Sequence, residues 1–217
     1  MDKSSRSIIG GIAGLFVAVF LGLSACKEKA PVPKPKTYLR PNFPEHSYTN
    51  TSVKHPCFSY RFDLNSYYSV GASAYNQSRA FFYFNQRLIT PFNARQIIEL
   101  GPFNGRLELF SFVFPSRDSL NRLINFSNDL VDEDKIKADS INFSRFLDPE
   151  HRIFGTFYRL YGNVANNFRF HITDSVHRFV LGNVMLECPP NYDSLQPSLD
   201  YIKLDLDRFL TSFRWNP

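Results

Sequence analysis

The sequence predicts an α+β domain, with a mainly antiparallel sheet covered by two or three helices and a C-terminal amphipathic helix packed on the sheet. Strand-like segments between residues 138 and 186 are joined by short turns, which require antiparallel neighbours. Apolar residues recur three and four positions apart over 116–131 and again over 195–213, as on amphipathic helices. The 217 residues also include 23 Phe and 11 Tyr, and aromatic side chains suit strands and cores.

The first half of the chain has the weaker pattern. Residues 38–75 contain prolines and show no clear period, so we expect irregular chain with short strands there. Residues 79–85 include a Phe-Phe-Tyr-Phe run and fit a buried strand. The segment 93–100 is expected to form a short helix that stops at Gly101, and the alternation over 106–114 predicts a strand.

A helix is predicted to follow Pro115. Ser116 is a suitable N-cap, and Asp118 lies in the first turn, where the helix dipole favours an acid. One face of this helix is formed by Leu120, Leu123, Ile124, Ser127, Leu130 and Val131. The spacing of these side chains predicts that this face is buried against the sheet.

Four strands in succession are predicted next. They cover residues 138–147, 152–160, 167–173 and 177–186, joined by turns at Asp148-Pro149-Glu150, Gly162-Asn163 and Asp174-Ser175. In the third strand, Phe168, Phe170 and Ile172 alternate with Asn167, Arg169, His171 and Thr173. This alternation predicts one apolar face and one polar face.

The last helix has a continuous apolar stripe made of Leu195, Leu199, Ile202, Leu206, Phe209 and Phe213. Asn191, Asp193 and Ser194 offer caps, and Pro197 is expected in the first turn, where a missing N–H does little harm. The polar face carries mixed charges rather than a basic surface, so packing on the sheet is favoured over lying on a membrane. The order of elements resembles the PsbP/Mog1-like layout.

The N-terminus has the pattern of an export signal. Lys3 and Arg6 precede residues 8–23, which carry no charge and are fewer than the roughly 20 apolar residues that span a bilayer. The segment Leu23-Ser24-Ala25-Cys26 resembles the lipobox of bacterial lipoproteins. The resemblance implies that the thiol of Cys26 receives diacylglycerol, with fatty acyl chains such as palmitate. The alternative is a retained transmembrane helix.

We therefore divide the chain into a lipoprotein signal peptide (1–25), a lipidated Cys with a Pro/Lys-rich tether (26–37) and a single globular periplasmic domain (38–217). Three prolines alternate between Lys27 and Lys36. Such a segment favours an extended conformation and gives about 30 Å of reach over ten residues.

Charge and cysteines limit the function classes. The net charge is +5, but basic residues are spread along the chain, so we expect no nucleic-acid partner. Once Cys26 is lipidated, Cys57 and Cys188 remain. An envelope location permits a disulfide between them, but they can equally be two separate small side chains.

No catalytic residue, cofactor or metal site is predicted, and the chain is not expected to be an enzyme. The five histidines, His46, His55, His151, His171 and His177, show no zinc-ligand spacing. Asp174 and Ser175 lie between two of them, but a turn-forming role is favoured over a hydrolytic triad. The acidic cluster of Asp129, Asp132, Glu133 and Asp134 is interpreted as a solvated turn rather than a calcium site, because a calcium loop's glycine and terminal glutamate are missing.

Several stretches resemble the gliding motility lipoprotein GldD family of Bacteroidota. They are Lys34-Pro-Lys-Thr-Tyr-Leu-Arg40, Ile136-Lys-Ala-Asp139, Gly155-Thr-Phe-Tyr158, Gly162-Asn-Val-Ala165, Thr173-Asp-Ser175, Pro190-Asn-Tyr-Asp-Ser-Leu195 and Ser212-Phe-Arg-Trp215. The resemblance implies a component of gliding and of the type IX secretion machinery, with no catalytic residues. Its partners would be the membrane, through the lipid anchor, and other proteins of that machinery.

Two function classes follow: a non-enzymatic assembly or stabilising subunit, and a ligand-binding or hydrolytic envelope lipoprotein. An exposed apolar patch favours the first class, and a large pocket with converging polar groups favours the second. Lys27 rather than Asp follows Cys26, and Glu28 is the only acid in the tether up to Lys36. We therefore expect an outer-membrane lipoprotein that faces the periplasm.

Overall fold

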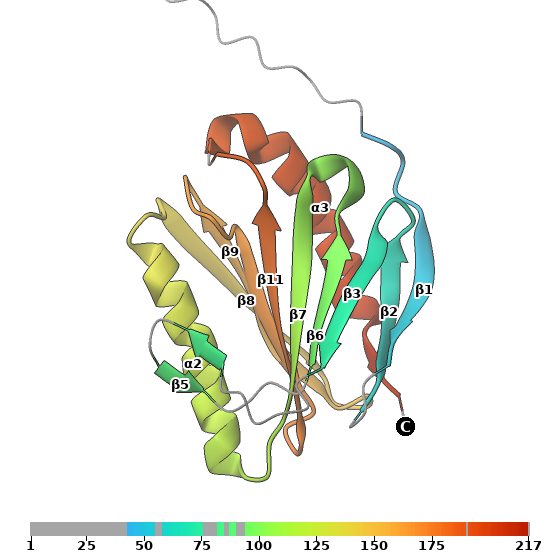
Figure 1. Ribbon diagram of the computed structural model, residues 1–217, viewed down its shortest axis with the longest axis vertical. Helices are drawn as coiled ribbons and strands as arrows, with labels where there is room; N and C mark the ends of the chain where they lie inside the picture. Colours follow the sequence, from blue (N-terminus) through green and yellow to red (C-terminus); the bar gives the residue numbers. More distant parts are fainter. Residues whose placement is uncertain are drawn as a thin grey trace, which may run out of the picture. The chain divides into compact units, whose positions relative to one another are not determined.

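The computed structural model describes residues 43–54, 58–75, 82–84, 87–89, 94–189 and 191–216. The predictions for the signal, for Cys26, for the whole tether and for Cys57 lie outside these residues. The described domain is built on one seven-stranded antiparallel sheet of order β3-β6-β7-β11-β10-β9-β8 (Figure 1). Its strands are β3 (Ser69–Tyr75), β6 (Ala94–Glu99), β7 (Gly105–Val113), β8 (Ser140–Asp148), β9 (Ile153–Tyr161), β10 (Phe168–Thr173) and β11 (Arg178–Leu186). The predicted α+β class and the meander of four strands from β8 to β11 are confirmed.

Two smaller sheets complete the strands. β1 (Tyr48–Val53), β2 (Tyr60–Asn65) and β12 (Arg214–Trp215) form one of them, in the order β1-β2-β12. β4 (Phe82–Phe84) pairs with β5 (Arg87–Ile89) in the other. The strand predicted over 79–85 is described only for residues 82–84, which are extended as expected.

The prediction of a short helix over 93–100 is wrong, because residues Ala94–Glu99 of this segment form strand β6. Ala94, Gln96 and Ile98 are buried, whereas the residues between them are more exposed. This is the two-residue period of a strand. Pairing with β3 on one side and β7 on the other supplies the backbone hydrogen bonds of this strand. The chain then turns through a 3₁₀ helix, η1 (Gly101–Phe103).

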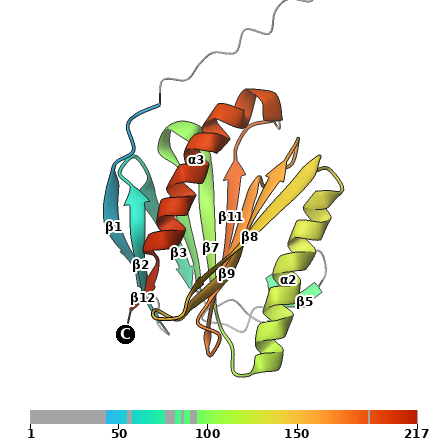
Figure 2. The ribbon, with the colours of Figure 1, turned by 180° about the vertical axis from the view of Figure 1, so that it is seen from behind.

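Helices α2 (Arg117–Lys135) and α3 (Tyr192–Ser212) cover opposite faces of the main sheet (Figure 2). The alternation along β7 shows this, because Leu107 and Leu109 belong to the core under α3 whereas Phe110 and Phe112 belong to the core under α2. β2 also packs against α3, so the larger core lies between the two sheets and that helix. Within the described residues, no helix is both long and apolar enough to cross a membrane.

Both helix predictions are confirmed in position, with one correction. The Ser116 hydroxyl accepts a hydrogen bond from the Ser119 N–H, as a helix N-cap does. At α3, Asn191 occupies the N-cap position without a side-chain bond, and Pro197 lies in the second turn rather than the first. Proline has no N–H to donate to the carbonyl of Asp193, four residues earlier. Both residues are exposed, so water can reach that carbonyl.

Candidate functional site

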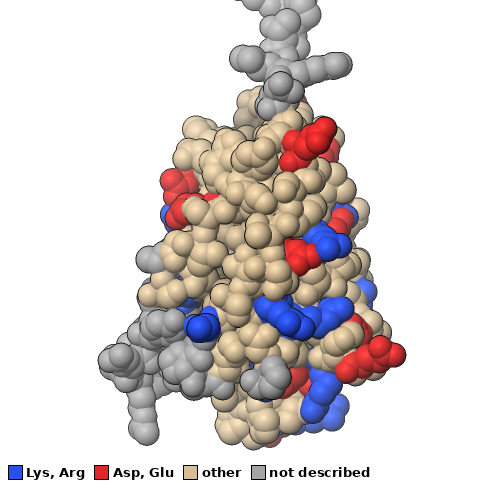
Figure 3. All heavy atoms as spheres, turned by 90° about the vertical axis from the view of Figure 1, so that its right-hand side faces the viewer, with Lys and Arg blue, Asp and Glu red and all other residues tan. Residues whose placement is uncertain are grey.

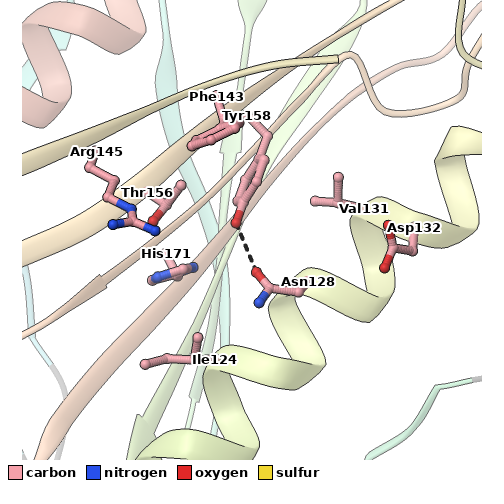
Figure 4. A pocket seen from close by; sticks show the side chains of 9 residues that line it. All are labelled: Ile124, Asn128, Val131, Asp132, Phe143, Arg145, Thr156, Tyr158 and His171. Atoms are coloured by element: carbon pink, nitrogen blue, oxygen red, sulfur yellow. Dashed lines mark hydrogen bonds between the residues drawn. The ribbon is translucent and has the colours of Figure 1, made fainter. Parts of the chain in front are cut away.

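One hollow of the described domain lies where α2 stops covering the sheet. α2 packs over β9, β10 and β11, and β8 continues beyond it. The uncovered face forms a groove of about 320 Å³ (Figure 4). Its lining comes from three strands and the helix: Ile124, Asn128, Val131, Asp132, Phe143, Arg145, Thr156, Tyr158 and His171. We call this the α2 groove.

The walls of the α2 groove carry both polar and apolar side chains. The Tyr158 hydroxyl donates a hydrogen bond of 2.8 Å to Oδ1 of Asn128, which ties β9 to the helix across the hollow (Figure 4). Burial raises the pKa of Tyr158. Arg145 and Asp132 supply opposite charges from β8 and α2, and Figure 4 shows them on opposite sides of the groove.

His171 lies in the floor of the groove, and its Nδ1 is 3.0 Å from the Ser127 hydroxyl. Its ring also stacks on Phe179. Only 1% of Ser127 is exposed, so this hydroxyl cannot reach a substrate as a nucleophile. Burial lowers the pKa of His171 from 6.5 to about 4. The pair is therefore a packing contact between α2 and β10.

We expect His171 to make the domain sensitive to acid. The folded state keeps this ring neutral down to about pH 4, whereas the unfolded chain binds a proton near 6.5. The unfolding free energy should therefore fall as the pH is lowered from 6.5 to 4, by about 3 kcal/mol from this residue. Urea unfolding at several pH values measures it. In His171→Gln this part of the slope should disappear, and an identical slope in both proteins would contradict the assignment.

Asp174 and Ser175 form a turn, as the sequence favoured. Oδ1 of Asp174 accepts hydrogen bonds of 2.8–2.9 Å from the backbone N–H groups of Val176, His177 and Arg178. Ser175 has a φ of 61°, in the left-handed region. His177 contacts the Phe114 carbonyl, while the ring of His171 points toward α2. These side chains are not brought together as a hydrolytic triad.

Within the acidic cluster at the end of α2, Asp134 differs from the prediction of a solvated turn. Asp134 accepts a hydrogen bond of 2.6 Å from Nε of Arg169, and only 3% of Arg169 is exposed. Nη1 of Arg169 also donates to Asn183 at 2.7 Å. Asp134 is thus the partner of a buried cation, whereas Asp132 and Glu133 are exposed as expected. The part of the chain that the structure describes has no cluster of three or more metal-binding side chains.

A buried carboxylate that the sequence analysis missed joins the beginning of the domain to α3. Asp205 is 4% exposed and accepts hydrogen bonds from His46, Tyr48, Asn65 and Tyr68. The pKa values of Tyr48 and Tyr68 are raised, mainly by burial and next by the hydrogen bond that each hydroxyl donates to Asp205. The only signal in the sequence was an aspartate on the apolar side of the α3 pattern.

Cys57, one member of the possible disulfide pair, lies outside the described residues. Cys188 is exposed and lies beyond the Leu186 end of β11. The pairing stays a prediction.

A second hollow, of about 340 Å³, lies on the other face of the sheet, between α3 and the β8–β9 hairpin. We call it the α3 groove. Its lining includes Phe146, Leu147, Phe157, Leu210 and Arg214. Strand β8 therefore has a groove on each face, and its outer edge has no neighbouring strand among the described residues.

The surface shown in Figure 3 is mostly uncharged, with acidic and basic side chains scattered over it. Among the described residues that this view shows, the basic side chains do not form one broad area.

The fold and grooves define an α+β domain with an open sheet edge. The chain belongs to the family described as gliding motility lipoprotein GldD, whose model matches residues 28–215. Membership places it among lipid-anchored cell-envelope proteins of gliding motility. Comparisons with curated proteins and with solved structures gave no match, so the PsbP/Mog1-like layout stays a resemblance in element order.

Proposed function

We propose that this chain is a non-enzymatic assembly or stabilising subunit of the machinery that drives gliding and type IX protein secretion. Family membership supports the gliding role. The observation that carries the assembly role is the exposure of Phe143 (63%) and Leu147 (70%) on strand β8. Large apolar side chains beside an unpaired strand edge are typical of a protein contact surface.

The experiment that tests this role is deletion of the gene followed by complementation. Cells without the chain should neither spread nor secrete type IX cargo, and the wild-type gene should restore both. A Phe143→Asp, Leu147→Asp variant should accumulate normally, because both positions are exposed, yet fail to restore them. Tyr67→Asp is the matched control, since Tyr67 is 51% exposed at a turn away from β8. Full restoration by the β8 variant would contradict the proposal.

The α2 groove supports a second candidate, the binding of a small ligand. Its volume of about 320 Å³ falls within the usual range for such sites. Two features favour the assembly role instead. The central Tyr158 hydroxyl is already bonded to Asn128, and the groove continues along β8 in a further hollow toward Lys135 and Ser140. If Arg145→Gln abolished gliding while the protein contacts of β8 stayed intact, the result would support ligand binding in the α2 groove.

Lipid attachment is proposed at Cys26. We expect Cys26→Ser to leave an unprocessed or released protein, because only a lipidated thiol would anchor the processed chain. Metabolic labelling with a palmitate analogue checks this, and wild type alone should be labelled. Ser24→Thr, which keeps a small residue beside the cleavage site, is a control that should retain the label. Equal labelling of wild type and Cys26→Ser would refute the assignment.

The proposed location is the outer membrane, with the domain facing the periplasm. The basic tether after Cys26 supports it, since its reach of about 30 Å would hold the domain close to the inner leaflet. Added protease should digest the domain only after the outer membrane has been permeabilised. Digestion on intact cells would instead indicate a surface-exposed domain.

A further inference from the structure

Strand β8 is an unusually open sheet edge for its length. It pairs with β9 over nine residues without a register shift, so its backbone is regular on the unpaired side as well. Natural edge strands are commonly blunted by lysine, proline, a bulge or short length. The other edge of this sheet, β3, has an irregular register between Val70 and Ser73, and β12 at the edge of the smaller sheet has two residues. β8 contains neither lysine nor proline.

The side chains of β8 also differ between its two faces. Phe146 packs against the main core on the α3 side. Alternation along the strand places Ile141, Phe143, Arg145 and Leu147 on the other face, and Leu147, near the end of the strand, also borders the α3 groove. Phe143 and Arg145 line the α2 groove. A strand added along this edge would therefore meet a row of apolar and basic side chains on the α2 side.

We propose that the edge of β8 binds β8 of a second copy of this chain, antiparallel, which joins the two seven-stranded sheets into one. In this register Ser144 faces Ser144 of the second copy, so all nine residues of the strand are paired. Phe143 then faces Arg145 of the other copy, twice, and Ile141 faces Leu147, twice. Aromatic–guanidinium and apolar cross-strand pairs are favourable.

The charge pattern selects this register. Moving the second strand by two residues in one direction would place Arg145 against Arg145, and like charges directly opposite are destabilising. Moving it in the other direction would carry Leu147 beyond the end of the partner strand. In the proposed register, Asp148 faces Ser140 and no like charges of β8 are opposed.

The geometry of the domain leaves room for this contact. α2 packs over β9 to β11 rather than over β8, and α3 has its largest contact with β2. Two-fold pairing uses the same edge on both copies, so the interface is closed and does not grow into a fibre. Anchoring on one membrane surface would further raise the effective concentration of the two copies. This inference rests on the assembly role proposed above and names its first partner.

Cross-linking at the two-fold position tests the pairing. The full-length lipoprotein with Cys57→Ser and Cys188→Ser carries Ser144→Cys and is treated, in its own cell envelope, with a short bis-maleimide. Two differently tagged copies in one cell identify the dimer. We expect at least tenfold more dimer than with Ser69→Cys, the matched exposed serine on the opposite edge strand β3. Equal or absent dimer would overturn the proposal.

An edge-blocking variant separates a specific interface from random collision. Phe143→Lys with Leu147→Lys, added to Ser144→Cys, should lower the dimer yield at least tenfold while the melting temperature stays unchanged. Tyr67→Lys should leave the yield unaltered. If the double variant is less stable, Leu147→Lys alone gives the same comparison. Cross-links from Ser144→Cys to a different protein, in place of the dimer, would refute self-pairing but would be compatible with the assembly role. Restored gliding in the Phe143→Asp, Leu147→Asp variant would refute the assembly role itself.

Discussion

Phe209→Asp is expected to unfold the domain. Phe209 is 2% exposed in the last turn of α3, and its ring lies 4.3 Å from Phe62 and 5.5 Å from Phe170, measured between ring centroids. Loss of a buried Phe side chain costs about 3–5 kcal/mol, and burial of an unpaired carboxylate adds several more. The sum is about as large as the whole stability of an ordinary domain.

Circular dichroism and urea unfolding measure the effect of Phe209→Asp. Leu204→Asp is the matched control, because Leu204 lies on the same helix but is 54% exposed. That variant should stay within about 0.5 kcal/mol of wild type. If Phe209→Asp melts like wild type, the apolar stripe of α3 is not a core contact, and the packing of helix on sheet is incorrect.

Asp205→Ala should have the second largest effect. The substitution removes the acceptor shared by Asn65, Tyr68, Tyr48 and His46, and Asn65 is itself 2% exposed. Removing one partner from a buried charged network costs about 3–5 kcal/mol, because the remaining donors are left without an acceptor. Asp205→Asn keeps one acceptor oxygen, so we expect a smaller loss.

Chemical unfolding and a spectroscopic titration check Asp205 together. The pKa of Tyr68 should fall in Asp205→Ala, because the carboxylate hydrogen bond and charge both raise it in the wild type. Asp207→Ala is the control on the same helix. Asp207 forms a partly exposed ion pair with Lys203, so its loss should cost about 0.2–1 kcal/mol. Comparable destabilisation by the two alanine variants would contradict a structural role for the buried network.

The sequence alone predicted those elements whose signals are local. Ser116 caps α2 through Ser119, three residues away, and the stripe of α3 follows from spacing within one helix. Leu199, Ile202, Leu206, Phe209 and Phe213 are each at most 3% exposed, as that stripe predicted. The meander from β8 to β11 follows from short turns between neighbouring strands, since such turns restrict pairing to antiparallel neighbours.

Only the tertiary structure decided which polar residues are buried. The polar face of β10 was expected to be simply polar, but Arg169 and His171 are covered by α2 and meet Asp134 and Ser127, 35 and 44 positions away. Asp205 likewise accepts hydrogen bonds from donors on β1, on β2 and in the turn after β2. The tertiary structure also decided that β6 is a strand, because β3 and β7 pair with it on either side. Periodicity in a chain reports which side chains share a face. The partner that covers that face comes from long-range packing, which is why the grooves beside β8 and its open edge appear only in the folded domain.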